Sequence, residues 1–86
     1  MSADNVTDHQ RQLLTLVADR ELNGRELARA FEQSAGRDIP FGTLYRTMDG
    51  MVAAGLVTSR EAHEGRRTRY YGITAQGRQA LHRQAD

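Results

Sequence analysis

The feature that most constrains this chain is a change of sequence pattern at Gly55. Before it, apolar residues recur at spacings of three and four, which is typical of helices that bury one face. After it, residues 56–61 (LVTSRE) and 68–73 (TRYYGI) are short and rich in β-forming residues, which is typical of strands. The polar segment 62–67 between them contains Gly65 and predicts a hairpin loop. The pattern therefore predicts helices followed by a β-hairpin.

Two helices are predicted in the first forty residues. The first runs over about residues 8–20 and is capped by Thr7 or Asp8. The second follows Asn23 and Glu26, which have the spacing of a capping box, and it ends before Gly36, because glycine favours left-handed helix ends. The apolar positions are Leu13, Leu14, Leu16, Val17 and Leu22 in the first helix, and Leu27, Ala28, Phe31 and Ala35 in the second.

A third helix is predicted over residues 42–54, and Thr74 caps a last helix that runs toward Ala85. The third helix has a stripe of apolar residues that we expect to be buried, at spacings i, i+4, i+7 and i+8: Leu44, Met48, Met51 and Val52. The order helix, helix, helix, hairpin, helix predicts an α+β, mostly α, winged helix-turn-helix fold. In that fold the third helix enters the DNA major groove. A three-helix bundle with an incidental hairpin is the alternative.

The length and composition predict one small domain. We expect residues 1–7 to be a flexible N-terminus and residues 8–86 to form a single winged-helix domain. The chain has no cysteine, so disulfides and thiolate metal sites are excluded. It has neither an apolar N-terminal stretch typical of a signal peptide nor an apolar run of the roughly 20 residues that a membrane helix needs. We therefore expect a cytoplasmic protein with no membrane association.

Positive charge is concentrated in the second half of the chain. Residues 1–41 carry five arginines and seven acidic residues, whereas residues 42–78 carry six arginines and three acidic residues. A basic region in a chain of net charge +1 is typical of a phosphate-binding face. A solvated surface of mixed charge is the alternative.

The third helix supplies one group of candidate DNA contacts. Opposite its buried stripe we expect an outward side formed by Thr43, Arg46, Thr47 and Gly50. Arginine can read guanine, threonine can contact phosphate or a thymine methyl group, and a glycine lets the DNA backbone approach closely. Tyr45 lies at the flank, where its ring would pack on the core and its hydroxyl would reach a phosphate. A purely structural aromatic at the core edge is the alternative for Tyr45.

The wing over residues 62–69 supplies the second group. Arg66, Arg67 and Arg69 lie on or beside its tip, next to Gly65. A basic loop there can follow the phosphate backbone or enter the minor groove, where negative potential is concentrated. An edge strand that charge protects from aggregation is the alternative. Tyr71 is expected to be more buried than its neighbouring tyrosine, because it alternates with Ile73 on one strand face.

Two blocks of the sequence resemble a known family, the PadR-like transcriptional regulators. The resemblance covers about residues 24–82. The first block is similar to the family's recognition-helix signature: Gly42-Thr43-Leu44-Tyr45, Met48, Met51 and Gly55-Leu56-Val57. The second is similar to its hairpin and last helix: Gly65-Arg66, Tyr70-Tyr71 and Ile73-Thr74-x-x-Gly77-Arg78-x-Ala80-Leu81. Tyr45-Arg46-Thr47 with Gly55-Leu56-Val57 also resembles winged helices of the ferric-uptake-regulator type, but the histidines 9, 63 and 82 are scattered, which disfavours a metal sensor.

The sequence departs from the family's pattern at several points. The family commonly has proline where this chain has Arg46, and a small polar cap where it has Pro40. The family also usually continues into a long C-terminal helix or helical domain that dimerises and forms an effector pocket, whereas this sequence ends at Asp86. We therefore expect a short form of the family, to which we assign no effector.

The function expected from the resemblance is transcriptional regulation, most simply repression by a homodimer that binds an inverted repeat in double-stranded DNA. The first and last helices are the candidate dimer surfaces, with His9, Leu13, Leu16 and Leu81 as candidate contacts. The sequence has no defensible Ser–His–Asp arrangement and no phosphate-binding loop, so we expect neither an enzyme nor a cofactor. The alternative function is a winged-helix module that binds a partner protein.

Overall fold

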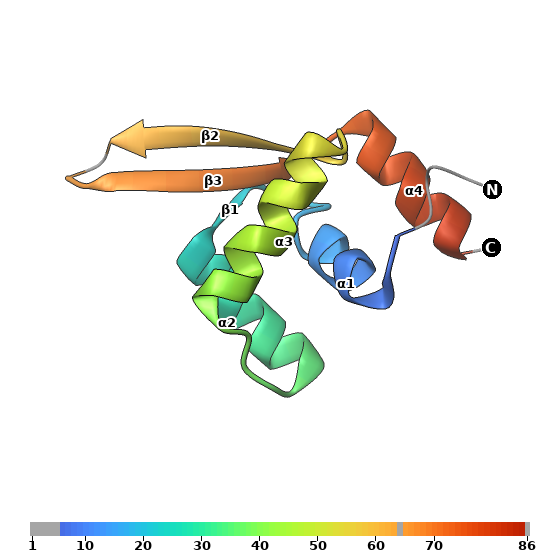
Figure 1. Cartoon of the computed structure of the whole chain (residues 1–86), viewed down its shortest axis with the longest axis horizontal. Coiled ribbons are helices and arrows are strands. Elements are labelled where there is room, and N and C mark those ends of the chain that lie inside the picture. The colour runs from blue at the N-terminus through green and yellow to red at the C-terminus, as the bar shows by residue number, and fades with distance from the viewer. Residues whose placement is uncertain (1–5, 64, 86) are drawn as a thin grey trace.

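The computed structural model describes residues 6–63 and 65–85 as a helical body from which a β-hairpin projects (Figure 1). The elements are α1 (Asp8–Leu16), β1 (Leu22–Asn23), α2 (Gly24–Ala35), α3 (Phe41–Ala53), β2 (Val57–His63), β3 (Arg67–Ile73) and α4 (Ala75–Ala85). The three strands form an antiparallel sheet in the order β1-β3-β2. The expected α+β winged helix-turn-helix fold is therefore confirmed.

Local sequence signals set most of the helix ends. Thr7 caps α1, where its side chain accepts a hydrogen bond from the backbone of Gln10 at 3.0 Å. The predicted capping box of α2 is present, since the Asn23 side chain accepts from the Glu26 backbone at 2.8 Å and Glu26 accepts from the Asn23 backbone at 2.9 Å. Gly36 ends α2 with φ 74°. Thr74 accepts from the backbone of the third residue of α4 at 2.9 Å.

The first helix is shorter than predicted. A helix over residues 8–20 was expected, but α1 ends at Leu16 and the chain turns through residues 17–21. Leu22, expected on the apolar face of that helix, instead forms β1 opposite Tyr71 of β3. The strand gives β3 a second hydrogen-bonding neighbour and buries the Leu22 side chain. This long-range pairing outweighs the local helical pattern.

The hairpin is longer, and its loop shorter, than the sequence suggested. The predicted loop over residues 62–67 was too wide, because His63 and Arg67 face each other as the last pair of the β2–β3 ladder. Gly65 has φ 84°, a conformation that glycine adopts without strain and that permits the tight reversal. Arg67 consequently lies on a strand. Glu64 within this loop and Asp86 at the chain end lie outside the described residues.

Two residues before α1 already make contacts with the rest of the fold. Val6 packs against the core and Thr7 caps α1. Residues 1–5 of the segment expected to be flexible lie outside the described residues. No helix in the described part of the chain combines the length and apolar character that crossing a bilayer requires.

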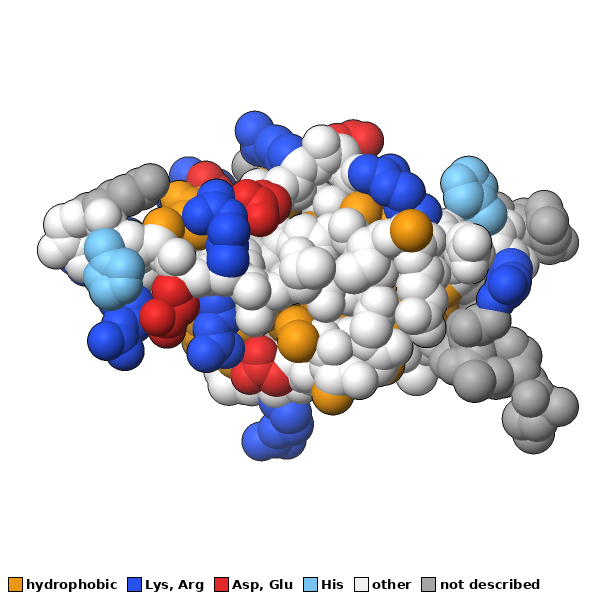
Figure 2. Space-filling model, turned by 90° about the horizontal axis from the view of Figure 1, so that it is seen from above, with side chains coloured by type: hydrophobic (Ala, Val, Ile, Leu, Met, Phe, Trp, Pro, Cys, Tyr) orange, Lys and Arg blue, Asp and Glu red, His pale blue; other side chains and the backbone are white. Residues whose placement is uncertain are grey.

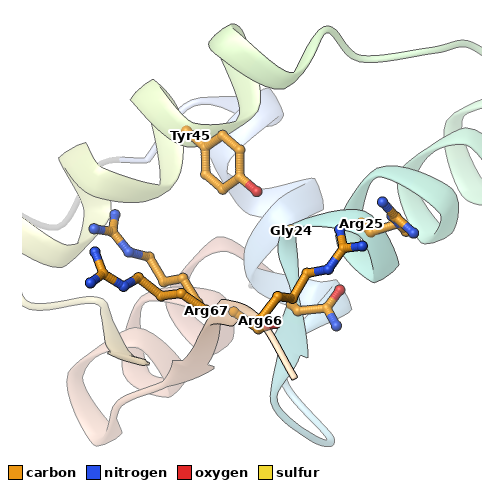
Figure 3. Close-up of a pocket in the computed structure, with 8 residues that line it drawn as sticks. Gly24, Arg25, Tyr45, Arg66 and Arg67 are labelled. Atoms are coloured by element: carbon orange, nitrogen blue, oxygen red, sulfur yellow. The ribbon is translucent and has the colours of Figure 1, made fainter. Parts of the chain in front are cut away.

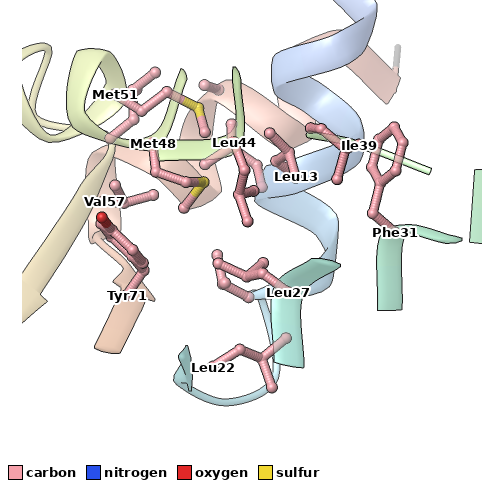
Figure 4. Close-up of a cluster of buried hydrophobic side chains, with 14 residues drawn as sticks. Leu13, Leu22, Leu27, Phe31, Ile39, Leu44, Met48, Met51, Val57 and Tyr71 are labelled. Atoms are coloured by element: carbon pink, nitrogen blue, oxygen red, sulfur yellow. The ribbon is translucent and has the colours of Figure 1, made fainter. Parts of the chain in front are cut away.

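The core lies where α3 crosses α1 and α2 and meets the base of the hairpin (Figure 4). The expected stripe of α3 is buried through Leu44, Met48 and Met51, whereas Val52 is half-buried. Burying one side of α3 in this way fixes which side remains exposed. The other buried apolar side chains are Leu13, Leu14, Val17, Leu22, Leu27, Phe31, Ile39, Leu56, Val57, Tyr71 and Ala80.

Gly77 lies at a close contact between α4 and the backbone of Leu56. A Cβ there would collide with the backbone carbonyl oxygen of Leu56 and would lie 2.8 Å from Cγ1 of Ile73. We expect Gly77→Ala to lower the free energy of unfolding by about 1–3 kcal/mol, measured by urea denaturation, because a backbone atom cannot move aside cheaply. Gly50→Ala is the matched control. It places a Cβ in open space within α3 and should raise stability by up to about 1 kcal/mol. Equal effects of the two substitutions would contradict this packing argument.

Candidate nucleic-acid interface

The exposed side of α3 carries most of the residues that the sequence placed there. Thr43, Arg46 and Gly50 are exposed, and a Cβ at Gly50 would meet no atom within 4 Å. Thr47 is half-buried at the border of this side, because it lies next to the buried stripe. Among the described residues, Arg46 makes neither an ion pair nor a side-chain hydrogen bond. Its charge is therefore uncompensated.

Tyr45 occupies the flank of α3 and is held in place by aromatic packing. Its ring stacks on Phe41 with centroids 6.2 Å apart and an interplanar angle of 23°, and it lies 6.5 Å from the ring of Tyr71. The hydroxyl end rests against Gly24, where an added Cβ would collide with it. The side chain remains 37% exposed. Tyr45 is therefore fixed at the core edge, with its hydroxyl directed toward the start of α2.

An open hollow of about 410 Å³ joins three elements that are distant in the sequence (Figure 3). Tyr45 of α3 forms one wall, and residues 66–69 of the wing form the opposite wall. The start of α2 closes the hollow with Asn23, Gly24 and Arg25. Sequence reasoning missed this third wall. The capping box located the start of α2, but no local signal placed it beside the wing.

Arg69 is bound to α3 and is not a free cation. Its Nη1 donates to Oδ1 of Asp49 at 3.2 Å and to the hydroxyl of Tyr71 at 3.4 Å, and that hydroxyl donates to the same Asp49 oxygen at 3.2 Å. The hydrogen bond with Tyr71 and the charge of Asp49 raise the pKa of Arg69. Burial raises the pKa of Tyr71 above its ordinary value of 10.0. These three side chains connect the base of the wing to α3.

Acidic side chains partner two other arginines of the hairpin, Arg60 and Arg67. Arg60 forms a 2.8 Å ion pair with Glu21 and lies over the ring of Tyr70, and Arg67 lies 3.9 Å from Glu61. Figure 2, which looks onto one face of the molecule, shows basic and acidic side chains next to one another over the hairpin. Arg66 has no ion-pair partner in the described part of the chain.

The hairpin register sets the direction of two arginines and confirms that Tyr71 is the more buried tyrosine. Arg67 and Arg69 alternate on β3 and so share a face. Tyr71 is fully buried, whereas Tyr70 is half-buried on the other face beneath Arg60. The shared face of β3 is the one directed toward α3, since Arg69 reaches Asp49 there.

Comparison with known proteins identifies the family. The profile of the transcriptional regulator PadR-like family matches residues 13–83. The chain belongs to this family. The match begins within α1 and ends within α4, and it includes α3 and the whole hairpin. A search of curated protein sequences finds no match.

Solved structures of RosR and of PadR have the same fold. RosR from H. salinarum is 27% identical with a TM-score of 0.86, and the alignment covers 98% of this chain and 74% of that one. The hsRosR-S1 chain, solved as a complex, is 28% identical with a TM-score of 0.87, covering 99% of this chain and 74% of the other. PadR from Bacillus subtilis, solved in complex with operator DNA, has a TM-score of 0.83 at 22% identity, covering 92% and 48% of the two chains.

The buried Tyr71 hydroxyl gives the fold a pH dependence in alkaline solution. Because the pKa of Tyr71 is higher in the folded state, the folded protein retains a proton that the unfolded chain releases. The contribution of Tyr71 to the free energy of unfolding is fully present below the pKa of an unfolded tyrosine, about 10. This contribution is lost as the pH rises through the higher pKa that Tyr71 has in the folded state. We expect the free energy of unfolding from urea titrations to fall as the pH rises above about 10, and Tyr71→Phe to flatten that decline. The same decline in the variant would refute the assignment.

Proposed function

We propose that this chain is a sequence-specific DNA-binding regulator that represses transcription as a homodimer on an inverted repeat. The observation that carries the proposal is the hollow in which α3, the start of α2 and the arginine-bearing wing meet. Three elements converge there on one surface beside the exposed side of α3, as contact with a duplex requires. The chain's family consists of transcriptional regulators, and one protein of the same fold, PadR from Bacillus subtilis, was solved in complex with operator DNA.

We assign the direct reading of bases to the exposed side of α3. Arg46 is uncompensated in the described structure and extends from the middle of α3, so it is free to make a two-pronged contact with guanine. Thr43 and Thr47 lie on either side of it along the helix and are assigned to phosphate or thymine methyl contacts. Gly50 leaves the surface open for the DNA backbone.

The walls of the hollow are assigned to phosphate binding, which positions the protein without selecting a sequence. Arg66 and Arg67 supply charge from the wing, Arg25 supplies it from α2, and Tyr45 offers a hydroxyl between them. Arg69 also lines the hollow. Since its guanidinium is already bound by Asp49 and Tyr71, its main role is to hold the wing against α3, and its contact with DNA is secondary.

A homodimer would place two recognition helices about 34 Å apart, one turn of B-DNA. The groove of about 400 Å³ between α1 and α4 is the proposed dimer surface, and Leu81 is among its lining residues. Leu16 is half-buried and available at its edge. Leu13, also a candidate, is fully buried and therefore excluded, while His9 packs edge-on against Phe31 with centroids 5.7 Å apart.

The decisive experiment is selection of bound fragments from a random pool of duplex DNA. The wild-type chain should enrich a motif that occurs as an inverted repeat. In Arg46→Ala the preference at one position of each half-site should relax, with a loss of about 1–3 kcal/mol on the selected sequence. An unchanged preference would refute the role of Arg46. Absence of any enrichment at low salt would refute DNA binding and favour the protein-interaction alternative.

The wing arginines can be tested separately through salt dependence. Binding constants are measured on the selected duplex over a range of salt concentrations. Arg66→Ala and Arg67→Ala should each reduce the slope of log K against log salt by about one, because each removes one phosphate contact. Arg20→Ala is the matched control, since Arg20 is an exposed arginine in the turn between α1 and β1 and lines neither the hollow beside the wing nor the groove between α1 and α4. A slope that changes equally in all three variants would contradict the assignment.

A further inference from the structure

Phe41 is a large apolar side chain that the fold leaves in solvent. It is the first residue of α3 and is 51% exposed, the highest value among the large hydrophobic residues described. A single exposed apolar residue is common on protein surfaces. This one differs because its ring is held in place by the stack on Tyr45, whose own hydroxyl end is fixed against Gly24. The fold therefore presents an ordered aromatic ring at the start of the recognition helix.

The two sides of the Phe41–Tyr45 stack differ in charge. The depression that contains Phe41 has both signs, from Arg25, Arg29, Glu32 and Asp38. The hollow that contains Tyr45 is lined by Arg25 and the wing arginines and by no acidic residue. An apolar protein surface docked over that hollow would bury its arginines without partners, at high cost. Duplex DNA suits both the arginines and the exposed ring, because its phosphates pair with arginines and its thymine methyl groups are apolar.

The position of Phe41 along α3 favours a base contact. The first turn of a recognition helix is the part that reaches base edges in the major groove. The thymine C5-methyl group is exposed in that groove and is contacted by apolar side chains, phenylalanine among them. Gly42 follows directly and leaves open space, since a Cβ there would meet no atom within 4 Å. The helix start can therefore approach the duplex closely.

We infer that Phe41 is a specificity-determining residue that recognises a thymine methyl group in the operator. The inference rests on the proposed function. It adds one base to the recognised sequence, a thymine that Phe41 reads without the help of the polar residues of α3. The contact would be apolar and independent of salt, which separates it from the contribution of the arginines.

The test uses the duplex selected with the wild-type chain, in which single thymines are replaced by deoxyuridine. This replacement removes only the methyl group. At one thymine of each half-site, the wild-type chain should lose affinity by about fourfold, the effect of one buried methyl-sized group. Phe41→Ala should bind the thymine and deoxyuridine duplexes equally, so that the two changes are coupled in a double-mutant cycle. Phe41→Leu, which keeps an apolar side chain, should retain part of the discrimination and serves as the second variant.

The outcomes are distinguishable. If no duplex is enriched, the proposed function and this inference fail together. If the operator is bound but no thymine position is coupled to Phe41, or if the half-site contains no thymine, only this inference is overturned. An unchanged affinity of Phe41→Ala for every duplex likewise overturns it. Thermal unfolding of each variant verifies that the fold is intact, as expected for a half-exposed position.

Discussion

The arrangement of this molecule depends on Tyr71, which joins the hairpin to the helical body. Its ring is fully buried and lies opposite Leu22 of β1 and Ser59 of β2 in the sheet register. Its hydroxyl is bound to Asp49 of α3 and Arg69 of β3. One side chain thus supplies apolar packing to the core and a polar link at its edge. Because the hydroxyl keeps hydrogen-bond partners, its burial leaves no unsatisfied polar group.

This link fixes the orientation of the wing relative to α3. Asp49 projects from α3 toward β3, and Tyr45, one turn earlier, packs against both Tyr71 and Gly24. The wing, α3 and the start of α2 are therefore held around one hollow before any ligand arrives. Binding by preorganised elements avoids the entropic cost of ordering a loop on the partner.

Ion pairing divides the arginines into two classes. Arg69 forms an ion pair with Asp49 and Arg60 forms one with Glu21, so both act mainly within the fold. Such ion pairs between exposed groups contribute little to stability, about 0–1 kcal/mol each, but they restrict the direction of long side chains. Arg46 and Arg66 have no such partner among the described residues and keep their charge for the solvent or for a polyanion. Net charge alone, at +1, would not have revealed this division.

The sequence alone determined the features governed by neighbours along the chain. The capping box at Asn23, the helix end at Gly36 and the cap at Thr74 depend on contacts over three or four residues, and each was predictable. The exposed side of α3 followed from helical periodicity, because the buried stripe leaves only one side free. The two motif blocks also sufficed to indicate the family.

Only the tertiary structure decided the features that join distant segments. Leu22 forms a strand because Tyr71, far along the chain, offers an unpaired edge, and no local preference encodes that pairing. Arg25 enters the candidate interface, and Arg69 is withdrawn into an ion pair, for the same reason: the groups that decide their roles lie on other elements. Periodicity reports which side of an element is apolar. Which element it packs against is set by the contacts of the whole fold.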